Sequence, residues 1–209
     1  CTKTDGVLVN VSNPITNISN DTIICYGNNV NLKISVSGGS PPYNYSWSPG
    51  NYTTATINVT PLNDTKYFVT ITDSYNCKAY DSVQVNISHI ITNAGQDDTI
   101  CIGGSTTLTG NGFGGYTPYS YSWSPGGYNN PSIIVSPSTT TTYTFNLTDS
   151  VGCTVSDNVI VIVSNPISVP GPNDSICIGD NSTLNGSAFD GIAPYQYLWS
   201  YANATTASI

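Results

Sequence analysis

The sequence contains no Glu, Arg or Met, and its only cations are four Lys, whereas twelve Asp give a formal net charge of −8. Good helix formers are therefore scarce. Nucleic-acid binding depends on clustered Lys and Arg, and so does attraction to anionic lipid, so neither partner is expected. No run approaches the roughly 18 apolar residues of a spanning helix. We therefore expect no direct membrane insertion, and any export signal would lie outside these residues.

The residues that are abundant favour strands and turns. Thr, Val, Ile and Tyr favour strands, and Asn, Gly, Ser and Pro favour the turns between them. The composition therefore predicts an all-β chain.

The chain is repetitive, with a period of 76 residues. Cysteines stand at positions 1, 25, 77, 101, 153 and 177, so the gaps alternate between 24 and 52, and Trp47, Trp123 and Trp199 keep the same period. Such spacing indicates tandem domains. We expect a segment of a longer array, with the last strand of a preceding repeat at 1–13, full repeats at 14–89 and 90–165, and a partial third repeat at 166–209.

The last strand of each repeat shows the clearest alternation. Its inward positions are predicted to be Val7, Val9 and Val11, then Val83, Val85 and Ile87, then Val159, Val161 and Val163. Residues that alternate in this way face one side of a strand. Short strands separated by Gly, Pro, Asn and Ser indicate antiparallel sandwiches with immunoglobulin-like topology.

The cysteines indicate disulfides, because a sandwich of this size is only marginally stable by burial alone. Pairs Cys25–Cys77 and Cys101–Cys153 would each close a 52-residue loop, worth roughly 4 kcal/mol. The alternative is a junction bridge from Cys25 to Cys153, because an immunoglobulin-like topology can place Cys25 and Cys77 at opposite ends of one domain. Both pairings stay open, with the first preferred. Either implies an oxidising, extracellular or cell-surface location.

Cys1 matches Cys77 and Cys153 in the repeat. We therefore expect it to be half of a disulfide and not a lipid anchor. Its partner, like that of Cys177, is expected outside these residues.

Several motifs resemble a known group. "SICIGDNSTL", "PYSYSWSPGG" and "TTTTYTFNLTDSVGC" resemble immunoglobulin-like and PKD-like repeats of long surface proteins, especially gliding-motility adhesins and other secreted proteins of Bacteroidota. "WSPG" departs from the turn that PKD domains carry after the Trp. The resemblance implies a module of a repeat protein and is weak for function.

The sequence offers few residues suited to catalysis. His89 lies in a connector, and its equivalents are Asn13 and Asn165. No spacing brings two Asp together across a cleft. We therefore predict that the chain is not an enzyme and has no cofactor and no metal. Calcium at the recurring Asp21, Asp97, Asp98 and Asp174 is an alternative to ordinary turn chemistry.

Two kinds of surface site are predicted. Asn-x-Ser/Thr sequons on outward strand positions are candidates for glycosylation, at Asn10, Asn44, Asn86 and Asn146. Asp-Ser/Thr-aliphatic triplets resemble those that Bacteroidota O-glycosylate, at Thr22, Ser82, Thr99, Ser150 and Ser175. The alternative for both sets is compositional bias.

A candidate interface lies at Ile160 and Ile162, where the first repeat has Gln84 and Asn86. Outward apolar residues on a strand attract a partner. The alternative is a rotated strand that buries both faces.

The functional hypothesis follows from the repeats. Short connectors, two with Pro at 14 and 166, predict a semi-rigid rod of tandem sandwiches. We expect a non-catalytic structural or adhesive stalk of a long extracellular protein or filament. Its partners would be neighbouring repeats, other copies in a filament or cell-surface glycans. The alternatives are a spacer array of a secreted hydrolase and a glycan-binding module.

Overall fold

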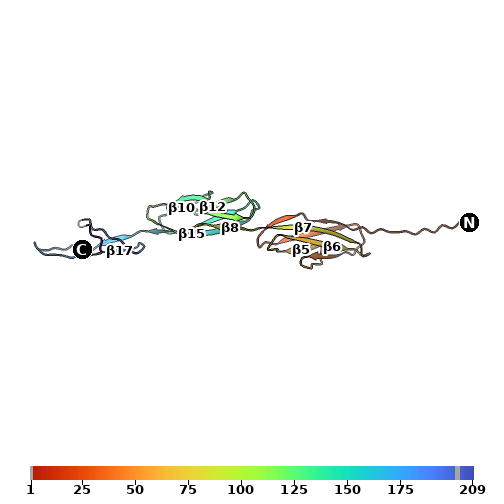
Figure 1. Cartoon of the computed structure of the whole chain (residues 1–209), viewed down its shortest axis with the longest axis horizontal. Coiled ribbons are helices and arrows are strands. Elements are labelled where there is room, and N and C mark those ends of the chain that lie inside the picture. Colours follow the sequence, from red (N-terminus) through yellow and green to blue (C-terminus); the bar gives the residue numbers. More distant parts are fainter. Residues whose placement is uncertain (1, 201–202) are drawn as a thin grey trace. The chain divides into compact units, whose positions relative to one another are not determined.

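The computed structural model describes residues 2–200 and 203–209, which form strands and turns without any helix (Figure 1). The all-β prediction is confirmed. No membrane-spanning helix is present among these residues. Residue contacts divide the chain into two compact units. The first consists of Cys1–Ile91, Phe113–Ser120 and Thr148–Val155. The second consists of Thr92–Gly112, Tyr121–Leu147 and Ser156–Ile209.

The first sandwich consists of two sheets from β1 to β7. One sheet has the order β1-β3-β5, from Ile15–Ile18, Val30–Ser37 and Thr56–Val59. The other has the order β2-β7-β6-β4, from Thr22–Cys25, Lys78–Ser88, Thr65–Thr72 and Asn44–Ser48. β2 runs parallel to β7, and the other neighbours are antiparallel.

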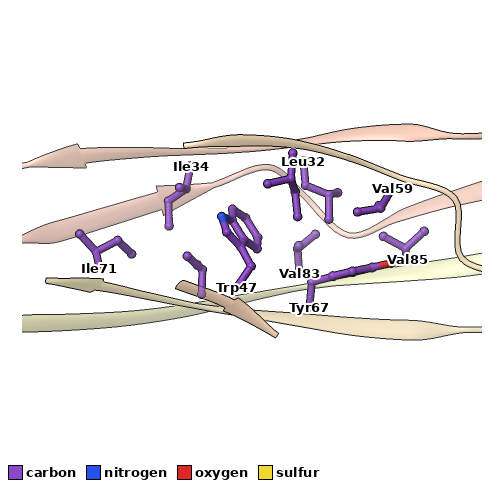
Figure 2. Packing of buried hydrophobic residues seen from close by; sticks show 10 residues of the cluster. Leu32, Ile34, Trp47, Val59, Tyr67, Ile71, Val83 and Val85 are labelled. Carbon is purple, nitrogen blue, oxygen red and sulfur yellow. The ribbon is translucent and has the colours of Figure 1, made fainter. Parts of the chain in front are cut away.

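The core of this sandwich lies between the two sheets. Trp47 is 1% exposed, and its indole lies between Leu32 and Ile34 of one sheet and Ile71 and Val83 of the other (Figure 2). The indole Nε1–H donates to the Thr54 carbonyl at 2.9 Å. The alternation predicted for the last strand is therefore present in β7, because only one face of this strand meets the opposite sheet.

The second sandwich repeats this plan with one interruption. Its larger sheet has the order β12-β14-β15-β9, from Ser120–Ser124, Thr141–Thr148, Thr154–Ser164 and Asp98–Cys101. Facing it are the pairs β10-β13, from Thr106–Thr109 and Ser132–Val135, and β8-β11, from Ile90–Asn93 and Asn111–Gly114. Gly110 separates β10 from β11, the two strands that correspond to the continuous β3.

Gly110 also marks a compensated change in the core. Its equivalent one period earlier is Ile34, and Phe145 stands where the first repeat has Val69. A Cβ added at Gly110 would lie 2.5 Å from the Phe145 ring, and Phe145 is fully buried. The larger side chain at one position therefore occupies the volume that Ile34 fills in the first sandwich.

Gly110→Ile is expected to lower the free energy of unfolding by about 1–3 kcal/mol through overpacking. The double variant Gly110→Ile/Phe145→Val reproduces the first repeat's pair and is expected to regain at least about 1 kcal/mol of this. Urea unfolding of both variants, with Phe145→Val alone as the control, checks the coupling. Additive losses would show that the two positions do not share one space.

The segments outside the two sandwiches have less strand structure. β16 (Ile167–Pro170) pairs antiparallel with β17 (Gly186–Phe189), and Trp199 Nε1–H donates to the Thr206 carbonyl at 2.9 Å. Residues 2–14 form no strand, and Val7, Val9 and Val11 are 90%, 78% and 85% exposed. The assignment of residues 1–13 to the last strand of a preceding repeat therefore stays a prediction, because a strand forms only beside partner strands and the described residues offer none here.

Candidate junction site

One end of the first sandwich is organised around the last residues of β2 and β7. The parallel register places Cys25 beside Ser88, and the Tyr26 N–H donates to the Ser88 carbonyl at 2.9 Å. The rings of Tyr26 and His89 stack with their centroids 4.3 Å apart. This pairing places Cys25 at the end of the sheet, beside the last residue of β7.

A tight loop of the same compact unit, residues 149–153, holds Cys153. The Asp149 Oδ1 accepts hydrogen bonds from the N–H of Val151 at 3.0 Å and of Cys153 at 2.8 Å. Oδ2 accepts from the Tyr116 N–H at 3.3 Å and from the Ser88 hydroxyl. Asp149 is 5% exposed and Ser88 is 1% exposed. One buried carboxylate therefore shapes the cysteine loop and ties it to the end of β7.

The structure joins Cys25 to Cys153 by a disulfide, with their Cα atoms 5.4 Å apart. The preferred pairings Cys25–Cys77 and Cys101–Cys153 are therefore wrong, and the alternative junction bridge is the one present. Cys77 precedes the 11-residue β7, whereas Cys25 lies beside its last residue. At about 3.3 Å per residue the two cysteines are separated by roughly 36 Å, far beyond the reach of a disulfide.

The Ser88–Asp149 contact was not predicted from the sequence, although a signal for it was present. Ser12 and Ser88 are one period apart, as are Asp73 and Asp149. Small polar residues recurring in this way have no obvious partner until the sheets place the end of one repeat's last strand beside the next repeat's loop.

The electrostatics of Asp149 follow from these contacts. Burial raises its pKa, but the hydrogen bonds from Ser88 and from the N–H groups of Cys153, Tyr116 and Val151 outweigh burial, so the pKa lies below its ordinary value. A carboxyl group with a depressed folded-state pKa stabilises the fold above its unfolded pKa, and this contribution is lost as the pH falls through the folded value.

We therefore expect the melting temperature to fall as the pH decreases below about 4, the ordinary Asp pKa. Asp149→Asn should melt at a lower temperature than the wild type at pH 7 and lose less on acidification. Thermal unfolding between pH 7 and pH 2 checks this. Asp180→Asn, at an exposed position whose side chain accepts no hydrogen bond in the described structure, is the control. Parallel curves for wild type and Asp149→Asn would contradict the assignment.

The other cysteines are placed differently. Cys77, Cys101 and Cys177 are unpaired within the described part of the chain. Cys77 is half-buried and Cys101 is exposed. The expectation for Cys1 lies outside the described residues.

The glycosylation candidates lie on the surface to different degrees. Asn10, Asn44, Thr99, Ser150 and Ser175 are exposed, and Asn86, Asn146, Thr22 and Ser82 are half-buried. The Asn86 side-chain oxygen accepts a hydrogen bond from Gln84 Nε2 at 3.1 Å. Access is therefore best at the exposed positions, and glycan attachment stays a prediction.

The candidate interface residues Ile160 and Ile162 are partly exposed. Ile160 is 36% exposed and Ile162 is half-buried. The Ile160 N–H donates to Asp97 Oδ1 at 2.8 Å, and Ile162 lies beside Thr99 of β9. A role for these two residues as an interface stays a prediction.

The recurring Asp residues mostly bond the backbone. Asp21 accepts from the Gln84 N–H at 2.8 Å, and Asp98 accepts from its neighbour Thr99 and from the Thr106 hydroxyl. In the described ranges no three His, Cys, Asp or Glu side chains are grouped to hold a metal ion. Asp21 thus connects the start of β2, the strand that ends in Cys25, to β7.

Comparisons with known proteins concern the fold alone. No protein-family model matches the sequence, and no curated protein matches it. Among solved structures, the three N-terminal domains of the highly immunogenic outer capsid protein Hoc of bacteriophage RB49 are 17% identical. This match covers 95% of this chain and 79% of that chain, with a TM-score of 0.45.

Two structures of tandem immunoglobulin domains match at similar identity. The IG1+IG2 structure of DIP-gamma is 16% identical, with coverage of 72% and 97% and a TM-score of 0.41. The N-terminal eight Ig domains of Down Syndrome Cell Adhesion Molecule are 17% identical, with coverage of 88% and 29% and a TM-score of 0.40. The sheet orders above, and not these matches, define the fold as tandem immunoglobulin-like β-sandwiches.

Proposed function

We propose that this chain is a non-catalytic structural or adhesive stalk segment of a long extracellular repeat protein. The observation that carries the proposal is the bridge from Cys25 to Cys153, which spans 128 residues and joins the first cysteine of one repeat to the second cysteine of the next. A bridge of this kind limits how far a pulled chain can lengthen, because the residues between the two cysteines cannot be drawn out while it is intact. This property suits a spacer that carries load.

Three further features support an extracellular stalk. The bridge requires an oxidising compartment to persist. The sequence has four Lys and no Arg, so an exposed chain offers few sites to trypsin-like proteases. Asn44 and Ser150 are exposed, and we include glycan attachment at such positions in the proposal.

The proposal is tested on the native protein in its source cells. Antibodies raised against the chain are used for immunogold labelling of intact cells and for immunoblots of extracts. We expect gold on the outer surface or on extracellular filaments and a band far above 22.0 kDa. Labelling confined to the cell interior, or a single free species near the mass of this chain, would overturn the proposal.

A further inference from the structure

The opposite end of the first sandwich has the same construction as the loop that holds Cys153. Asp73 Oδ1 accepts from the N–H of Tyr75 and of Cys77, each at 2.9 Å. Oδ2 accepts from the Ser40 N–H at 3.2 Å and from the Ser12 hydroxyl. These four contacts repeat, one period earlier, the four contacts of Asp149. The loop that presents Cys77 is therefore shaped like the loop that presents the bonded cysteine.

The approach of the preceding segment is also repeated. A Cβ added at Gly114 would lie 2.3 Å from the His89 carbonyl oxygen, and one at Gly38 would lie 2.6 Å from that of Asn13. Both glycines have positive φ, of 78° and 68°, a conformation that favours glycine. Residues 12–14 thus lie against the first sandwich in the way that residues 88–90 lie against the loops 113–120 and 148–155.

The two ends differ in whether a strand carrying a partner cysteine is present. Beside Ser88 stands Cys25, delivered by a strand parallel to β7, and it reaches Cys153. Beside Ser12 the described residues provide no such strand, and Cys77 is unpaired. The other half of such a bridge, a cysteine at the end of a strand parallel to the last strand of its repeat, also recurs. Cys101 lies in parallel register with Ser164 of β15 and is exposed and unpaired, like Cys25 without its partner.

We propose that the surface formed by residues 12–14, Gly38–Ser40 and Asp73–Cys77 is the acceptor half of a second junction, whose partner is another sandwich of this repeat. That sandwich's second strand ends in a cysteine beside the position of Ser12, and this cysteine forms a disulfide with Cys77. Cys101 is the donor half for the following junction. The bridges would then follow one rule, from the first cysteine of a repeat to the second cysteine of the next.

Each bridge forms by oxidation of two thiols. The Cys77 thiol and the partner thiol lose two protons and two electrons and form one S–S bond. The electrons reduce a disulfide of the thiol–disulfide exchange class, such as oxidised glutathione, to two thiols. The proposal deepens the proposed function and rests on it only for the presence of further repeats.

The test uses the full chain with one repeat duplicated. A copy of residues 14–89 is inserted after Asn13. The copy carries Cys77→Ser, so that only the original repeat contains Cys77. The protein is refolded in a glutathione redox buffer and alkylated without reduction. One portion is digested with trypsin, which distinguishes the two copies of Cys25, and another with endoproteinase Asp-N, which places Cys101, Cys153 and Cys177 on separate peptides. Both digests are mapped by mass spectrometry. We expect the Cys77 peptide, residues 67–78, linked to the peptide that begins at Thr4 and contains the copy's Cys25. The original Cys25–Cys153 link, measured in the same sample, reports correct folding.

The matched control moves the serine to the other copy. With Cys77→Ser in the original repeat and the copy's cysteine kept, the number of cysteines is unchanged, and the copy's Cys25 is expected to stay alkylated. If Cys77 is alkylated in the first protein while Cys25–Cys153 is formed, or is linked to Cys1 or to Cys101, the proposal is wrong. This readout is independent of where the native protein is located, so its failure is distinguishable from failure of the stalk proposal.

Discussion

Cys25→Ser is expected to lower the free energy of unfolding by as much as about 5 kcal/mol. The bridge to Cys153 closes a segment with a sequence separation of 128 residues, and the chain-entropy model gives about 5 kcal/mol for a loop of this length. Guanidinium unfolding under non-reducing conditions measures the change as a lower midpoint. The loss should disappear when wild type and variant are compared in a reducing agent.

Two further variants separate the bridge from the side chains. Because both cysteines serve one bond, Cys25→Ser/Cys153→Ser should lose much less than the sum of the two single variants. Cys101→Ser removes an exposed, unpaired thiol and should stay within about 0.5 kcal/mol of the wild type. Equal midpoints for wild type and Cys25→Ser without reductant would contradict a stabilising bridge.

Trp47→Ala is expected to lower the free energy of unfolding by about 3–5 kcal/mol, the usual cost of removing a large buried aromatic side chain. Trp47 is 1% exposed, contacts both sheets of the first sandwich and satisfies its N–H on Thr54. Its removal leaves a cavity at the centre of the core. Urea unfolding followed by circular dichroism measures the loss.

Tyr80→Ala is the matched control for this prediction. Tyr80 lies on β7 of the same sandwich but is 70% exposed, so its truncation should cost no more than about 0.5 kcal/mol. A Trp47→Ala loss no larger than the Tyr80→Ala loss would show that the indole does not organise the core.

Strand alternation was predicted correctly where the strand has neighbours on both sides. Val83, Val85, Val159 and Val161 are all fully buried, because β7 and β15 lie inside four-stranded sheets that face a second layer. The third predicted inward residue of each strand, Ile87 or Val163, is only half-buried. The same pattern at residues 7–11 gave exposed valines. Alternation reports which side chains would share a face, and burial requires a second surface that the pattern does not supply.

The core exchange at Gly110 shows a similar limit. The period identifies Gly110 and Phe145 as departures from Ile34 and Val69, but not that they compensate each other. That conclusion needed the distance between a would-be Cβ and the Phe145 ring, since the two residues are 35 positions apart in the sequence.

The sequence by itself determined the all-β class, the 76-residue period and the inward positions of the central strands. Each of these depends on residue type and spacing, which a linear chain records directly. Only the tertiary structure decided which cysteines pair and what holds them. The 11-residue length of β7 places Cys77 and Cys25 at opposite ends of the first sandwich, whereas the loop around Asp149 brings Cys153 to Cys25. Disulfide pairing depends on distance in space, and spacing along the chain does not contain it.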